Sequence, residues 1–113
     1  MLKPVPANLL DKAKSLNPYA RFPNTPGQGN VEASYFLRDV EQDILYYFAT
    51  ARAFDGNLYL LNHIVPEKEI NSLPQILLNS PYIYIKWDED GNITEWAAGQ
   101  QKMGGQNGGR FYS

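Results

Sequence analysis

The feature that most constrains the fold is the strict alternation of residues 82–87, which read Tyr-Ile-Tyr-Ile-Lys-Trp. Successive residues of a strand point to opposite faces of a sheet, so the two isoleucines and the tryptophan would share one face. A polar turn containing Gly91 follows at residues 88–92, and the chain returns through residues 93–96. Alternation beside such a turn predicts a β-hairpin, and therefore an antiparallel sheet.

A second hairpin is predicted around Gly56. The tripeptide at residues 55–57, Asp-Gly-Asn, separates two apolar runs, 49–54 and 58–65, and Pro66 ends the second run. Glycine adopts without strain the positive φ that a tight turn needs. The chain is therefore expected to reverse direction here as well, which adds strands to the same kind of sheet.

The segment of residues 32–54 admits two interpretations. Its aromatic and β-branched residues favour two strands, 34–38 and 43–50, joined by a polar turn at 39–42. The alternative is a helix over residues 32–42, because apolar residues also recur there at helical spacing. We favour the two strands.

Two short helices and one long loop complete the predicted elements. Residues 7–16 carry an apolar stripe at helical spacing, and Pro6 suits the first turn of that helix. Residues 72–75, Ser-Leu-Pro-Gln, match a capping box that would open a helix ending at Leu78. Repeated prolines and glycines at residues 17–30 predict an irregular loop.

Together these elements predict an α+β fold. It has a short N-terminal helix, an antiparallel sheet of about four to five strands, one short helix between the hairpins and a flexible, Gly-rich C-terminal tail. We expect a single domain over residues 1–98, because 113 residues leave no room for two domains. Residues 99–113 are rich in Gly and Gln and are expected to form the tail.

The composition excludes several classes of site. The chain has no cysteine, which rules out disulfides, zinc sites with thiolate ligands and cysteine nucleophiles. No apolar run approaches the roughly 18 residues that span a bilayer, and residues 1–6 lack the apolar core of a signal peptide. We therefore expect a soluble, cytoplasmic protein with no membrane partner.

Charge is unevenly distributed along the chain, although the net charge is only −2. Every acidic residue except Asp11 lies between Glu32 and Glu95, whereas both ends of the chain carry more basic than acidic residues. An acidic central region favours a partner protein with a basic surface over a nucleic acid, whose phosphates require clustered Lys and Arg. The alternative is that the basic ends fold back over the acidic middle.

Few residues are available for catalysis. His63 is the only histidine, and no nucleophile or acid stands beside it in the sequence. If the protein is an enzyme, we expect a metal-independent, ribonuclease-like or toxin hydrolase in which His63 is the base and Arg52 or Arg110 stabilises a phosphate. The glycines of residues 104–109 lack the Lys-Ser/Thr of a phosphate-binding loop, and the acidic turn at 88–92 lacks EF-hand spacing. No cofactor or metal is predicted.

The aromatic residues favour a binding role instead. A tyrosine-rich sheet surface suits a protein interface, where tyrosine is enriched, and aromatic residues at the end of a tail tend to dock. We therefore predict a non-catalytic protein-binding module, such as a regulator, an inhibitor or an immunity-type protein. A structural or assembly subunit with a docking tail is the other non-enzymatic alternative. The predicted binding residues are Tyr47, Tyr59, Tyr82, Tyr84, Arg110, Phe111 and Tyr112.

Overall fold

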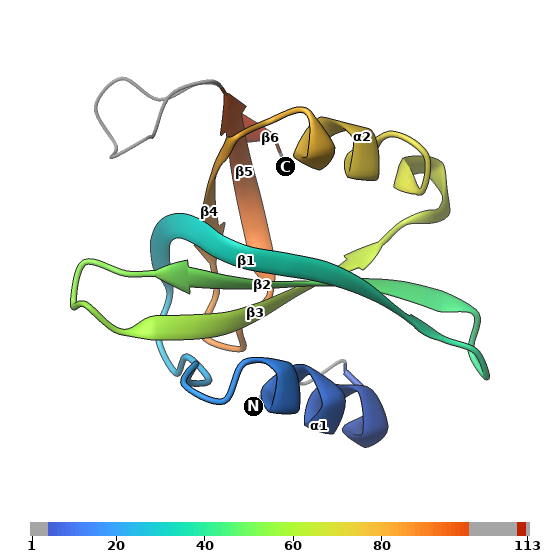
Figure 1. Ribbon diagram of the computed structural model, residues 1–113, viewed down its shortest axis with the longest axis horizontal. Coiled ribbons are helices and arrows are strands. Elements are labelled where there is room, and N and C mark those ends of the chain that lie inside the picture. Colours follow the sequence, from blue (N-terminus) through green and yellow to red (C-terminus); the bar gives the residue numbers. More distant parts are fainter. Residues whose placement is uncertain (1–4, 100–110, 113) are drawn as a thin grey trace.

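The computed structural model describes residues 5–99 and the backbone of residues 111–112 (Figure 1). The predicted α+β class is confirmed, with an N-terminal helix, an antiparallel sheet and a short helix between strands. In these residues no helix is long and apolar enough to cross a membrane. The elements in chain order are α1 (Ala7–Leu16), β1 (Gly27–Asp39), β2 (Ile44–Arg52), β3 (Leu58–Val65), the 3-10 helix η1 (Glu67–Glu69), α2 (Leu73–Leu78), β4 (Tyr82–Trp87), β5 (Ile93–Gly99) and β6 (Phe111–Tyr112).

The sheet has the strand order β3-β2-β1-β4-β5-β6, and every neighbouring pair is antiparallel. β1 joins its two parts, because residues 30–39 pair with β2 whereas only residues 27–30 pair with β4. The register shifts between Val31 and Ala33, where these two pairings meet, and such a bulge bends and twists a strand. The β4–β5 hairpin consequently crosses over β1, β2 and β3 instead of continuing their plane (Figure 1).

The curled sheet is closed by a contact between β3 and the β4–β5 turn. The backbone N–H of Asn62 donates to the carbonyl of Gly91 at 2.9 Å. The side-chain amide of Asn62 donates to Oδ1 of Asn92 at 2.8 Å, and Asn62 is completely buried. The sheet therefore wraps around an interior, like a barrel that is only partly closed.

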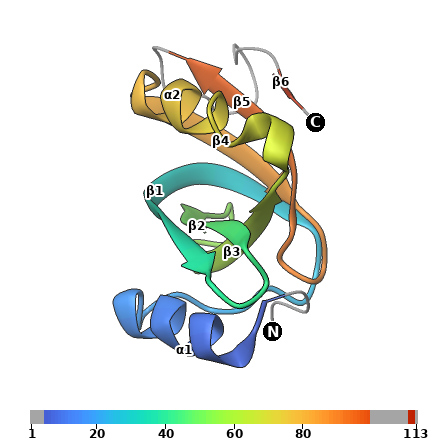
Figure 2. The same ribbon diagram turned by 90° about the vertical axis from the view of Figure 1, so that its right-hand side faces the viewer.

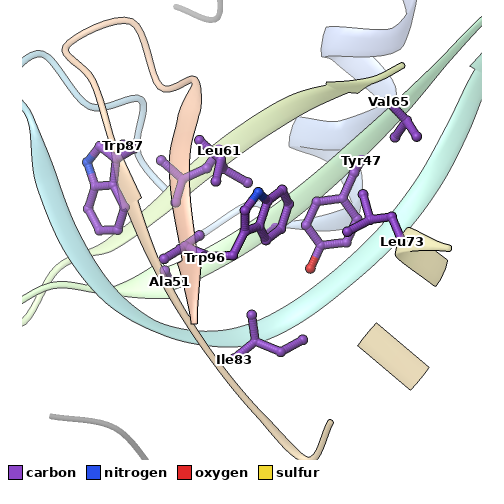
Figure 3. Close-up of a cluster of buried hydrophobic side chains, with 11 residues drawn as sticks. Tyr47, Ala51, Leu61, Val65, Leu73, Ile83, Trp87 and Trp96 are labelled. Atoms are coloured by element: carbon purple, nitrogen blue, oxygen red, sulfur yellow. The ribbon is translucent and has the colours of Figure 1, made fainter. Parts of the chain in front are cut away.

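The main core fills the space between the two parts of the sheet (Figure 3). The alternation predicted for β4 is confirmed, since its two isoleucines and Trp87 belong to this core. Tyr47 from β2 packs against Trp96 from β5, with ring centroids 5.4 Å apart. Leu73 from α2 joins the same cluster. Residues far apart in the sequence thus supply one interior.

A second core lies on the opposite face of β1, β2 and β3. Leu9 and Leu10 of α1 belong to the same cluster as Tyr46 and Phe48 of β2. Figure 2 shows α1 and α2 on opposite sides of the sheet. Because both faces of β2 are covered, every residue from 46 to 51 is buried.

Most of the predicted elements are confirmed. The helix over residues 7–16, both hairpins and the two strands within residues 32–54 are present, and the alternative helix over 32–42 is wrong. Gly56 and Gly91 have positive φ angles, 85° and 82°. The local turn chemistry therefore predicted the backbone correctly at both hairpins.

The predicted loop at residues 17–30 is wrong at its end, because residues 27–30 form the first part of β1. A Cβ atom on Gly29 would lie 2.1 Å from the carbonyl oxygen of Arg52, and one on Gly27 would lie 2.7 Å from the indole ring of Trp87. These glycines therefore allow neighbouring groups to approach closely within a sheet, and they do not mark a loop.

The predicted capping box at residues 72–75 is also wrong. The side chain of Ser72 makes no cap hydrogen bond, and its backbone is already helical, with φ −90° and ψ −42°. An N-cap residue needs extended backbone angles for its side chain to reach the first helical N–H groups. The chain instead enters α2 from the turn that follows η1.

The predicted C-terminal tail lies mostly outside the described residues. β5 runs to Gly99, and the backbone of Phe111–Tyr112 pairs with β5 at Trp96 and Ala97. Arg110 is outside the described residues, and only the backbone of Phe111 and Tyr112 is described. The binding role predicted for these three residues stays a prediction.

Candidate functional site

β1 is much longer than the strand beside it, which leaves one of its edges open. β1 has 13 residues and β4 has 6, and β4 pairs only with residues 27–30. In the part of the chain that the structure describes, no strand or isolated bridge pairs with the β4-facing edge of residues 31–39. An unpaired strand edge is a template to which another strand can add.

The alternation of hydrogen bonds identifies the groups at this open edge. The backbone N–H of Ala53 donates to the carbonyl of Asn57 at 3.0 Å, so odd-numbered residues of β2 face β3 and even-numbered ones face β1. Even-numbered residues of β2 stand opposite odd-numbered residues of β1 after the bulge. Ser34, Phe36 and Arg38 therefore direct their backbone N–H and C=O groups toward the open edge.

The open edge lacks most of the devices that block strand addition. Residues 31–39 contain neither Pro nor Lys, which natural proteins place on edges to prevent pairing. Ala33 and Ser34 are exposed and small, so another backbone can approach them. Arg38 is the only basic residue of this stretch, and it forms an ion pair with Asp43. An incoming strand would therefore meet an accessible edge.

A pocket of about 560 Å³ adjoins this edge where β1 and β4 separate. Val31 and Glu32 belong both to the edge and to the wall of the pocket. Phe54 from the β2–β3 turn and Tyr82 from β4 also line it, and they are 79% and 42% exposed. Tyr84 lines it too but is buried. The volume lies within the range of ligand pockets.

Arg52 lines the same pocket, but its charge is compensated by Glu32. Nε donates to one carboxylate oxygen at 2.8 Å and Nη2 to the other at 3.2 Å, while Nη1 donates to the carbonyl of Gly56 at 2.8 Å. The hydrogen bond with Glu32 raises the pKa of Arg52. In the described lining these are the only charged residues, so the pocket has no net charge. An anion clamp on Arg52 would first have to break this pair.

The predicted tyrosine-rich sheet surface is wrong at two positions. Tyr47 is fully buried in the main core, and burial raises its pKa to about 12. Tyr84 is also buried, and this raises its pKa. Tyr82 is exposed, and Tyr59 is half-buried with its hydroxyl donating to Asp55 at 2.7 Å. Alternation predicts which residues share a face, but it does not reveal whether that face is covered.

His63 faces the main core at the far end of β3. Its ring meets Trp96 edge to face with centroids 5.0 Å apart, and 19% of its side chain is exposed. Nε2 lies 3.7 Å from Oε1 of Glu69, which is too long for a hydrogen bond. Burial lowers the pKa of His63 more than the neighbouring Glu69 raises it. The imidazole is therefore held in a mainly apolar environment beside one carboxylate.

The structure does not bring His63 and Arg52 together. Arg52 stands opposite Leu58 at one end of β3, whereas His63 stands opposite Tyr47 near the other end. The base and the phosphate-stabilising arginine of the hydrolase hypothesis are thus separated along the strand. The structure does not describe Arg110, so the second arginine of that hypothesis stays untested.

Several acidic residues of the central region hold turns instead of forming a sheet surface. Oδ1 of Asp55 accepts the backbone N–H of Asn57 at 2.8 Å, and Oδ1 of Asp88 accepts that of Asn92 at 2.9 Å. Within the described residues, no three His, Asp or Glu side chains converge on a position where they could hold a metal ion. Asp55 and Asp88 therefore stabilise the two hairpin turns.

Comparison with known proteins provides no assignment. No protein-family model, no curated protein and no solved structure is significantly similar to this chain. The open edge of β1 and the adjoining pocket are therefore interpreted from their own geometry. Sequence analysis missed both, because no local signal reports that β1 extends beyond β4.

Proposed function

We propose that this protein is a binding module that captures an extended segment of a partner protein by strand addition to the open edge of β1. The observation that carries the proposal is that no strand among the described residues pairs with the outer edge of residues 31–39, where the backbone groups of Ser34, Phe36 and Arg38 are directed outward. In strand addition, backbone hydrogen bonds supply affinity and pockets for alternate side chains supply specificity. The pocket beside the edge meets the second requirement.

Within this proposal the module is non-catalytic and acts in the cytoplasm as a regulator, an inhibitor or an immunity-type protein that occupies its partner. The partner is another protein with basic character near the bound segment. Glu41 and Asp43 are exposed in the β1–β2 turn, at the end of the open edge away from the pocket; Asp43 is paired with Arg38, so Glu41 is the acidic group offered to the partner. Opposite charges at the rim of an interface steer association and fix register.

The test is a proline placed on the open edge. Ser34→Pro removes an N–H that points outward and leaves the hydrogen bonds between β1 and β2 in place, which is where strands tolerate proline. Ser34→Ala is the matched control, because it shortens the side chain and keeps the N–H. Peptides selected from a random display library on the native protein should bind Ser34→Ala equally and Ser34→Pro roughly tenfold more weakly, a loss of about 1.4 kcal/mol.

Fluorescence anisotropy of the selected peptides measures this loss, and circular dichroism verifies that both variants are folded. Equal binding to Ser34→Pro would overturn the proposal, as would a library that yields no binding peptide. Light scattering provides a further outcome. A dimer that Ser34→Pro converts to a monomer would place a second copy at the edge and would contradict a role in capturing other proteins.

A further inference from the structure

The walls of the pocket beside the open edge include exposed aromatic rings. Phe54 comes from the β2–β3 turn and Tyr82 from the start of β4, and 79% and 42% of their surfaces are exposed. Exposed apolar side chains that are scattered need no explanation, whereas those grouped in one concavity mark binding sites. A ligand that enters the pocket would therefore cover these two rings.

The charges in the pocket oppose a charged occupant. Glu32 and Arg52 form an ion pair with two hydrogen bonds at its wall. They are the only charged residues of the described lining, so the positive and negative charges of the pocket balance. A charged group entering here would meet one attractive and one repulsive partner, and it would lose its hydration. An uncharged group avoids both costs.

The pocket lies on one face of the sheet, which limits what can enter it. Asn30 stands directly opposite Arg52 on one side and opposite Tyr84 on the other, and directly opposed residues share a face. All three residues line the pocket. In a strand added along β1, every second side chain would point to the face of the sheet that holds the pocket. The side chain of the added strand that lies beside Glu32 would then enter the pocket.

We infer that the pocket accepts an uncharged aromatic side chain, Phe, Tyr or Trp, of the captured segment. This inference rests on the proposed strand addition and names the side chain that the module recognises. An aromatic ring gains from packing against Phe54 and Tyr82 beyond the apolar area that it buries, which an aliphatic side chain does not.

The experiment compares side chains at one peptide position. A peptide selected on the native protein is synthesised with Phe, Leu, Lys or Asp at the position where the selected sequences share a residue type. We expect the Phe peptide to bind roughly tenfold more tightly than the Leu peptide, and the Lys and Asp peptides to bind more weakly than either. Tyr82→Ala should remove the difference between Phe and Leu. Tyr19→Ala is the matched control, because Tyr19 is 90% exposed and does not line the pocket.

Phe54→Ala serves as a second variant, since Phe54 lies in a turn where its truncation leaves the core intact. An aromatic preference that disappears in Tyr82→Ala or Phe54→Ala and persists in Tyr19→Ala supports the inference. Selected peptides without a shared aromatic residue, a preference for Lys or Asp, or a preference unchanged in both pocket variants would overturn it. If Ser34→Pro still weakens binding, those outcomes refute only the aromatic preference, and strand addition is retained. If the peptides bind Ser34→Pro as tightly as the native protein, strand addition itself is refuted.

Discussion

The turn between β2 and β3 and the turn between β4 and β5 contain the same tripeptide, Asp-Gly-Asn, at residues 55–57 and 90–92. The glycine has nearly the same positive φ in both turns, 85° at Gly56 and 82° at Gly91. Each glycine N–H donates at 3.0 Å to the carbonyl of the residue three positions earlier. The same residues therefore build the same turn twice.

The surroundings of the two turns differ. No atom lies within 4 Å of a Cβ built on Gly56, and the backbone N–H of Asn57 donates within its own turn to Asp55. In the second turn, Asn92 and Gly91 both accept hydrogen bonds from the buried Asn62 of β3. One turn projects into solvent, and the other closes the sheet.

This difference teaches that local sequence specifies the shape of a turn but not its importance for stability. The same substitution can be made at the equivalent asparagine or glycine of each turn, so each turn serves as the control for the other. The expected differences follow, beginning with the largest.

Asn92→Ala should lower the free energy of unfolding by about 1–3 kcal/mol, because it leaves the fully buried amide of Asn62 without its partner. Asn57→Ala should cost less, because the half-buried Asn57 donates only a long hydrogen bond, 3.5 Å, to the hydroxyl of Tyr59, and its truncation leaves no fully buried group without a partner. Urea denaturation measures both values. Equal losses would mean that the closing contact adds no more stability than the turn that projects into solvent. The double variant Asn62→Ala/Asn92→Ala should cost less than the sum of the single variants, since both remove one interaction.

Gly56→Ala should cost about 1 kcal/mol, because alanine is strained at positive φ and nothing else lies near its Cβ. Gly91→Ala should cost more, because Gly91 is buried against β3 as well as strained. Gly56→Asn should recover most of the loss, since asparagine tolerates this conformation. Thermal and urea denaturation compare the three variants. A larger loss at Gly56 than at Gly91 would contradict the assigned roles of the two turns.

The smallest effect concerns Asp55, whose pKa is lowered mainly by the hydrogen bond from the Tyr59 hydroxyl and also by the backbone N–H of Asn57. Because the folded pKa lies below the unfolded value of about 3.9, ionised Asp55 favours the fold at higher pH. That contribution is lost as the pH falls through the folded pKa. Tyr59→Phe should therefore raise the pKa of Asp55, and NMR titration of its carboxyl carbon measures the change. Tyr19→Phe is the control, and an unchanged Asp55 titration in Tyr59→Phe would refute the role of the hydroxyl.

The features that the sequence predicted correctly are likewise the local ones, and those it missed depend on tertiary contacts. α1 and both hairpins were predictable, because helical spacing, alternation and a glycine at positive φ are signals within a few neighbouring residues. Exposure was not, since Tyr47 and Tyr84 lie on strands that alternate correctly but are buried. The glycines at 27 and 29 resembled a loop because close approach by Trp87 and Arg52 cannot be seen locally.

The candidate site was less predictable than the fold. Arg52, Tyr82 and Tyr84 were singled out individually, and they line one pocket. These residues come together because the pairing of β1 with β4 ends at Asn30, and no sequence motif predicts where that pairing ends. One form of the hydrolase hypothesis required His63 and Arg52 to meet, and strand register separates them, because Arg52 of β2 stands opposite Leu58 whereas His63 of β3 stands opposite Tyr47.

Local chemistry alone therefore established where the chain turns, which segments are extended and which residues share a strand face. Only the three-dimensional arrangement decided that β1 extends past its neighbour, that no described strand pairs with the outer edge of residues 31–39, and that a pocket forms where the strands separate. The physical reason is that backbone angles and side-chain periodicity depend on adjacent residues. Strand pairing and burial depend on which distant segments come together, and that cannot be read from adjacent residues.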